Sequence, residues 1–146
     1  MLGSFEGATG IKTGYTKKAG RCLVTSAKRG NLELVSVVLN CYDMWRKSTD
    51  LLNNAFNAYE YKKLVDQNNF VDFILDKSGE KIGVYVKEDF FYPLKKDEDK
   101  DVSLKFSYKN INKTVKKDSE VGKIDIYLKN NLIFSKKTYN IIDIKN

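Results

Sequence analysis

The sequence predicts an α+β protein in which an antiparallel sheet with one helix is followed by a small all-β sandwich. Up to about residue 60, Gly, Ala, Thr and aliphatic residues dominate, and three short apolar runs precede one stretch of helical period. After that point, Lys, Asp, Asn, Tyr and Phe alternate with β-branched residues in runs that turn residues separate. We therefore expect two domains, residues 1–61 and 62–146.

Three strands are expected in the first domain, over residues 9–15, 22–28 and 32–39. The turn Arg29-Gly30-Asn31 connects the last two, because Gly and Asn tolerate positive φ. The run from Leu32 to Leu39 is apolar on both faces, which is typical of a central strand covered on each side. Together the three runs predict an antiparallel meander.

The stretch 43–61 has the period of an amphipathic helix. Asp43 is a suitable residue to cap its start. The side chains that recur at three- and four-residue intervals and predict its buried stripe are Met44, Ser48, Leu51, Leu52, Ala55, Phe56 and Tyr59. We expect this helix to lie on one face of the sheet and no further element of the chain to cover the other.

The second domain reads as five alternating runs, over residues 70–75, 81–87, 102–108, 123–129 and 132–139. The turns Lys77-Ser78-Gly79-Glu80 and Asn130-Asn131 are typical hairpin connections. The charged run from Lys95 to Asp101 is expected to be an exposed loop. Short strands without a helical period favour a β-sandwich.

Composition excludes several classes of function. The 26 basic residues are interspersed with 19 acidic ones, and no nucleic-acid-binding spacing accompanies the net charge of +7, so we expect no nucleic-acid partner. Histidine is absent, which argues against a Ser-His-Asp triad and against metal catalysis, and no cofactor is expected. Neither a run of about 18 apolar residues nor a signal-peptide pattern occurs.

The two cysteines cannot form a tetrahedral metal site by themselves. Cys22 and Cys41 are expected near the open end of one hairpin, where a disulfide is geometrically conceivable. Two buried free thiols on apolar strands are the simpler alternative.

The most informative motif is Gly-Ile-Lys-Thr-Gly-Tyr-Thr, which begins at Gly10. The stretch from Glu6 to Thr16, with Ala19 to Val24 after it, resembles the Lys-Thr-Gly strand of the serine-type D-alanyl-D-alanine carboxypeptidases, the low-molecular-mass penicillin-binding proteins. Residues 115–133 resemble the C-terminal β domain of the same enzymes. This resemblance implies a partial penicillin-binding/β-lactamase-like sheet and a cell-wall hydrolase that trims terminal D-alanine from peptidoglycan peptides.

The resemblance also implies roles for the strand residues. Lys12, the catalytic-site residue of the chain, and Thr13 would offer a cation and a hydroxyl to the substrate carboxylate. Gly14 would let the substrate backbone approach as an added strand. The backbone N–H of Tyr15 would be one of two oxyanion-hole donors.

Two further substrate-binding candidates each have an ordinary alternative. Thr16 would assist in carboxylate binding, or it would cap the turn that follows the strand. Arg46 would supply a second cation for the carboxylate, or it is a solvated arginine in the first turns of the helix.

The other two motifs of the family, Ser-x-x-Lys with the acylated serine and Ser-x-Asn, have no counterpart here. Ser78-Gly79-Glu80-Lys81 fits the first only formally, because the motif requires the serine to open a helix and these residues read as a hairpin turn. We therefore expect a C-terminal fragment that is inactive alone. The intact enzyme would be extracytoplasmic, associated with the cell wall or membrane, and would bind peptidoglycan pentapeptides ending in D-Ala-D-Ala and β-lactams.

Two other interactions are expected from the sequence. The β domain is alternatively a non-catalytic module that binds the cell wall or another protein. The strand from Leu32 to Leu39 would lack a partner on its outer side, and such a flat apolar edge favours self-association.

Overall fold

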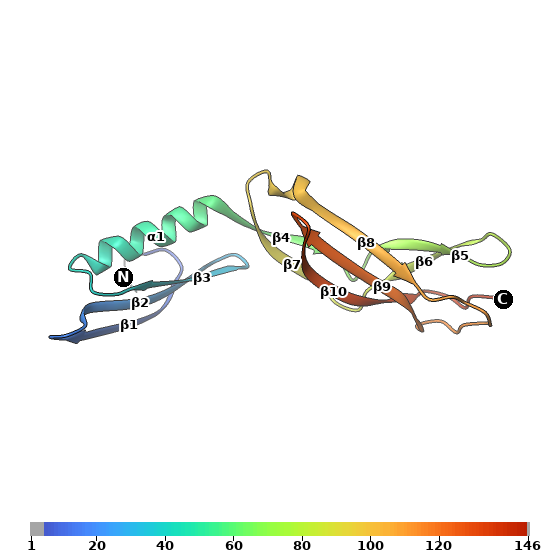
Figure 1. Ribbon diagram of the computed structural model, residues 1–146, viewed down its shortest axis with the longest axis horizontal. Helices are drawn as coiled ribbons and strands as arrows, with labels where there is room; N and C mark the ends of the chain where they lie inside the picture. Colours follow the sequence, from blue (N-terminus) through green and yellow to red (C-terminus); the bar gives the residue numbers. More distant parts are fainter. Residues whose placement is uncertain (1–4, 146) are drawn as a thin grey trace. The chain divides into compact units, whose positions relative to one another are not determined.

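The computed structural model describes residues 5–145, which are mostly β with one helix and several antiparallel sheets (Figure 1). They divide into two compact units. The first contains the residues up to Tyr61 together with Pro93–Lys96, and the second contains Lys62–Tyr92 and the residues from Asp97 onward. No helix within residues 5–145 combines the length and apolar character that crossing a membrane requires.

The first unit contains the expected antiparallel meander. Strands β1 (Ala8–Thr16), β2 (Gly20–Arg29) and β3 (Leu32–Val38) are hydrogen-bonded in the order β1-β2-β3. Within residues 5–145, β3 lies at an edge of the sheet, as expected for a strand without a partner on its outer side, and not at the central position that its apolar run favours. Val35 and Val37 are 65% and 56% exposed, since alternate side chains of a strand point to opposite faces. Self-association through this edge stays a prediction.

Helix α1 (Met44–Ala58) packs on the other face of β2 and β3 (Figure 1). Leu52 is buried in a cluster with Phe5 and Ala27. Beside this cluster, three hydroxyl groups form a buried chain. Thr25 and Ser36 lie 3.0 Å apart, and Ser36 donates to Ser48 at 3.1 Å. Burial of hydroxyls is tolerated here because each has a partner.

Two details of the predicted helix are wrong. Leu51 is 45% exposed and lies outside the buried stripe, because Leu52, one position further on, occupies the face toward the sheet. Asp43 stands at the N-cap position but makes no side-chain capping bond, because its carboxylate pairs with Arg46 instead. The helix ends at Ala58, and the chain continues directly into a strand.

The second unit contains a five-stranded antiparallel sheet in the order β5-β6-β10-β9-β8. Its strands are β5 (Asp72–Leu75), β6 (Lys81–Tyr85), β8 (Val102–Tyr108), β9 (Glu120–Leu128) and β10 (Asn131–Asn140). All five were expected, with ends shifted by a few residues. Apolar side chains on one face form two buried clusters, one around Ile82 and Val84 and one around Ile124 and Ile126.

Three elements have no counterpart in the sequence prediction. Strands β4 (Tyr59–Val65) and β7 (Phe90–Lys95) pair as a separate two-stranded sheet. The 3-10 helix η1 (Glu98–Asp101) lies in the charged run. The prediction of an exposed loop is wrong at Glu98, whose side chain is only 12% exposed and pairs with Lys129 at 2.8 Å.

We expect Leu52→Ala to destabilise the first unit by about 2–5 kcal/mol, because it leaves a cavity between helix and sheet. Leu51→Ala, one position away and 45% exposed, is the matched control and should change stability by less than about 0.5 kcal/mol. Urea unfolding followed through the single tryptophan measures both. Equal effects of the two substitutions would contradict the observed packing of the helix.

Acid should weaken the second unit through Asp125. This carboxylate is 7% exposed and accepts hydrogen bonds from Lys123 at 2.6 Å and Ser135 at 2.5 Å. The Lys123 bond, followed by that of Ser135, lowers the pKa of Asp125 below its ordinary value. Because the folded-state pKa is depressed, the stabilisation is present above the unfolded-state pKa of about 3.9 and is lost as the pH falls through the folded-state value.

Accordingly, Asp125→Asn should lower the free energy of unfolding by about 1–2 kcal/mol at pH 7. It should also make the free energy of unfolding less sensitive to acid between about pH 5 and about pH 2, the range around that unfolded-state pKa. Asp97→Asn is the control, because Asp97 is exposed and its positive φ of 64° suits asparagine. Urea midpoints across this range provide the measurement. An unchanged acid profile for Asp125→Asn would show that the pair with Lys123 does not couple to folding.

Candidate functional site

The Lys-Thr-Gly motif lies on β1, a strand that is paired on one edge only. Lys12, Thr13 and Gly14 stand opposite Val24, Leu23 and Cys22 of β2. Within residues 5–145, no strand pairs with the outer edge of β1. The residues from Lys12 to Thr16 are all exposed. This edge therefore has room for an added extended segment.

Strand alternation separates the two polar side chains of the motif. Thr13 shares a face with its buried partner Leu23, on the side that helix α1 covers. Lys12 shares the opposite face with Val24, which is 40% exposed. The Lys12 ammonium donates a hydrogen bond to the backbone carbonyl of Thr13 at 2.9 Å. The ammonium is thus held near the strand by a contact that a stronger, anionic acceptor can replace.

A hollow of about 550 Å³ adjoins the strand on the helix side. The strand contributes Thr13, Gly14 and Tyr15, and the first turn of α1 contributes Met44 and Trp45. Arg21, directly opposite Tyr15 on β2, completes the lining. The hollow therefore combines a hydroxyl, a guanidinium and an aromatic wall beside a strand edge that no other described strand occupies.

Thr16 uses its hydroxyl to close the turn after β1. Its Oγ1 accepts a hydrogen bond from the backbone N–H of Ala19 at 2.9 Å. This contact is the turn-capping alternative considered for Thr16. A role of Thr16 in carboxylate binding stays a prediction.

The two arginines near the site differ in position. Arg46 is not among the residues that line the hollow, and its exposed guanidinium pairs with Asp43, a hydrogen bond that raises the pKa of Arg46. Arg21 lines the hollow, and its guanidinium carbon lies 4.7 Å from the centre of the Tyr42 ring. The sequence analysis did not single out Arg21. Its position opposite the residue that follows the motif is the signal that could have indicated it.

The structure also places the two cysteines and Ser78, the remaining residues that the sequence analysis considered. Cys22 and Cys41 are both free and partly buried, so the alternative without a disulfide holds. Ser78 lies in a turn, where its hydroxyl donates to Asp76 at 2.6 Å, and no helix begins there. Within residues 5–145, no cluster of three or more His, Cys, Asp or Glu side chains could hold a metal ion.

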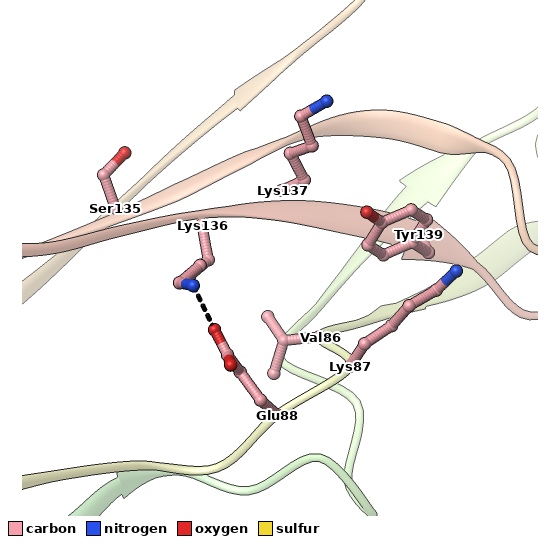
Figure 2. Close-up of a pocket in the computed structure, with 7 residues that line it drawn as sticks. All are labelled: Val86, Lys87, Glu88, Ser135, Lys136, Lys137 and Tyr139. Atoms are coloured by element: carbon pink, nitrogen blue, oxygen red, sulfur yellow. Dashed lines mark ion pairs between the residues drawn. The ribbon is translucent and has the colours of Figure 1, made fainter.

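The second unit has a hollow of about 510 Å³ between the segment that follows β6 and the second half of β10 (Figure 2). Its lysines are already engaged. Lys136 pairs with Glu88 across the hollow, as the dashed line in Figure 2 marks, and Lys137 pairs with Glu120 at 2.5 Å. The Lys87 ammonium lies 4.0 Å from the centre of the Tyr139 ring. Because these charges are largely compensated, the hollow is not a strong anion site.

Comparison with known proteins gives matches to both parts of the chain. The profile of the family described as penicillin-binding protein 5, C-terminal domain, matches residues 59–145, and that of D-alanyl-D-alanine carboxypeptidase matches residues 2–43. The D-alanyl-D-alanine carboxypeptidase DacF of Bacillus subtilis is 33% identical over 129 residues, which cover 84% of this chain and 33% of that protein.

Solved structures with the same fold include two bacterial proteins. The D-alanyl-D-alanine carboxypeptidase DacD of Francisella tularensis matches with a TM-score of 0.71 and 29% identity, over 99% of this chain and 38% of that one. Penicillin-binding protein 5 of Haemophilus influenzae matches with a TM-score of 0.64 and 24% identity, over 93% and 43%. The chain thus spans about a third of the curated relative it matches.

Proposed function

Because the chain belongs to the D-alanyl-D-alanine carboxypeptidase family of penicillin-binding proteins, we propose that it supplies the substrate-binding strand of such an enzyme. In this proposal the enzyme works outside the cytoplasm at the cell wall. It removes the terminal D-alanine of peptidoglycan pentapeptides through an acyl-enzyme, and β-lactams acylate the same serine. Residues 1–61 are the end of its catalytic domain, and residues 62–146 are the β-sandwich domain.

The observation that carries the proposal is the exposed Lys12-Thr13-Gly14 segment on a strand whose outer edge pairs with no other strand of the described residues 5–145. A peptide that adds to this edge forms main-chain hydrogen bonds, and Gly14 leaves room for its backbone. The Lys12 ammonium, which lies 2.9 Å from the Thr13 carbonyl, and the Thr13 hydroxyl then approach its terminal carboxylate from the two faces of the strand, and the N–H of Tyr15 stabilises the oxyanion. Arg21, in the hollow beside Tyr15, is a better placed second cation for the carboxylate than Arg46.

In this proposal, catalysis by the chain alone is not expected. Its sequence offers no serine at the start of a helix with a lysine one turn later, and no Ser-x-Asn. A binding strand without a nucleophile orients a substrate but forms no bond to it. The chain by itself is therefore inactive in this account.

We expect no covalent labelling when the 146-residue protein is incubated with fluorescent penicillin, and no release of D-alanine from a D-Ala-D-Ala peptide. The physical reason is the missing acylated serine. Gel fluorescence and a D-alanine assay measure the two quantities, with an intact carboxypeptidase as positive control. A labelled band would contradict the proposal.

Reversible binding tests the strand itself. Trp45, the single tryptophan, is 42% exposed in the hollow, so its fluorescence should respond to a diacetyl-Lys-D-Ala-D-Ala peptide. The same peptide with an amidated C-terminus should have little effect, because Lys12 needs a carboxylate.

Loss of the ammonium in Lys12→Gln should weaken binding of the free acid about tenfold. Lys18→Gln is the matched control, since Lys18 is exposed in the adjoining turn. Equal binding of the acid and the amide, or equal losses in the two variants, would remove the role proposed for Lys12.

A second candidate function is a non-catalytic module that binds the cell wall. It is favoured by the second unit, which has hollows of its own apart from the Lys-Thr-Gly strand. Retention of the protein on insoluble peptidoglycan tests this function. It does not depend on Lys12.

A further inference from the structure

A smaller hollow of the second unit has the features of a preformed ligand site. Its volume is about 270 Å³, slightly below the usual range for small-molecule sites, which begins at about 300 Å³. One wall is the loop between β4 and β5, with Gln67, Asn68 and Asn69, and Phe70 follows directly. The facing wall is formed by Tyr85 and by the loop that contains Asp118.

The backbone of the amide-rich loop is fixed. Gln67 N–H donates to the Asp89 carboxylate, and Asn68 N–H donates to the Asp66 carboxylate, both at 2.9 Å. Lys63 contacts both acceptors, at 2.8 Å from Asp89 and 3.5 Å from Asp66. This ion pair lowers the pKa of Asp89, so the carboxylate remains charged across the neutral range. The loop is therefore held in place without help from its own amide side chains.

Those three amide side chains are exposed, and within residues 5–145 no hydrogen bond engages them. Each side-chain amide offers two N–H donors and one acceptor oxygen. Because the backbone is already fixed, a polar ligand that engages these amide groups has only their side chains to order.

The facing wall is rigid as well. The buried Asn140 side chain donates to the Lys116 and Ile142 carbonyls at 2.9 and 2.6 Å and accepts from Ser119 N–H at 2.9 Å. Asp118, with a left-handed φ of 61°, accepts a hydrogen bond from the Tyr85 hydroxyl at 3.0 Å. Its carboxylate has acceptor sites left for a ligand hydroxyl.

Phe70 provides an apolar platform beside these polar groups. Its ring is 54% exposed and stands edge-on to Phe73, with ring centres 5.8 Å apart. A Cβ at Gly83 would lie 3.1 Å from the Phe70 ring, so the glycine allows the ring to rest on the sheet. An exposed aromatic ring fixed in this way can stack on an apolar ligand face.

We infer that this hollow binds a saccharide segment that carries acetamido groups. The C–H face of a sugar ring stacks on Phe70, and its hydroxyls donate to Asp118. The acetamido N–H and C=O pair with the side chains of the amide-rich loop, which offer the complementary acceptor and donors. The inference goes beyond the peptidase function and is independent of Lys12. It names a ligand for the binding-module function.

The test is a titration of the full ¹⁵N-labelled chain with chitotetraose, followed by NMR. Amide shifts should change at the loop of Gln67 to Phe70, at Tyr85 and at Asp118. Cellotetraose, which has the same β-1,4 linkage without acetamido groups, should bind at least about tenfold more weakly, because the loop amides then lose their partners. No shift at millimolar chitotetraose, or equal binding of the two sugars, would overturn the inference.

The matched variants are Phe70→Ala and Phe73→Ala, two phenylalanines with 54% and 51% exposure of which only Phe70 lines the hollow. Phe70→Ala should weaken chitotetraose binding about tenfold, and Phe73→Ala less than about twofold. Asn68→Ala, whose backbone anchor is unaffected, should weaken it several-fold and keeps the test valid if Phe70→Ala does not fold.

Equal losses in the two phenylalanine variants would place the ligand elsewhere and overturn the inference. Retention on insoluble peptidoglycan separates the two proposals. If the wild type and Phe70→Ala are retained equally, the module function stands and this site is wrong. The binding of D-Ala-D-Ala peptides, read from Trp45, is unaffected by either result.

Discussion

The arrangement of the site depends on the pairing of β1 with β2 along one edge only. This pairing fixes Lys12 opposite Val24 and Thr13 opposite Leu23, and it leaves the outer hydrogen-bonding edge of the motif without a strand partner in the part of the chain that the structure describes. Because side chains alternate, the same register directs Thr13 toward the helix side and Lys12 toward the open face. A shift of the β1–β2 register by one residue would exchange the faces on which these two side chains lie and would abolish the site.

Packing behind the strand maintains that register. Leu52 and the hydroxyl chain of Thr25, Ser36 and Ser48 attach α1 to the sheet, and the start of the helix brings Met44 and Trp45 to the hollow. The apolar contacts stabilise the interface, whereas the buried hydroxyls restrict it to one alignment, since any shift would leave them unpaired. The positions of Arg21 and Arg46 follow from this arrangement. Arg21 extends from the strand beside the motif, while Arg46 is held by Asp43.

Local sequence patterns predicted much of the fold. The meander followed from apolar runs and turn residues, and the five strands of the second unit followed from alternation and turn residues. The sequence did not predict β4 and β7, because Lys62 and Lys63 interrupt one strand and Pro93 the other, and their pairing joins segments far apart in the chain. Leu51 and Leu52 are equivalent by composition, so only tertiary contacts decide which is buried. Arg21 was missed because its place opposite Tyr15 depends on the cross-strand register of the hairpin and not on a linear motif.

We propose that the edge of β1 holds a D-Ala-D-Ala peptide as an added strand, with its carboxylate at Lys12 and Thr13. Intermolecular NOEs between such a peptide and the ¹⁵N-labelled chain test it most directly. Backbone contacts are expected in antiparallel register along the residues from Lys12 to Tyr15, with the terminal methyl group near Thr13. Contacts confined to another surface, or none along β1 at saturating peptide, would contradict it.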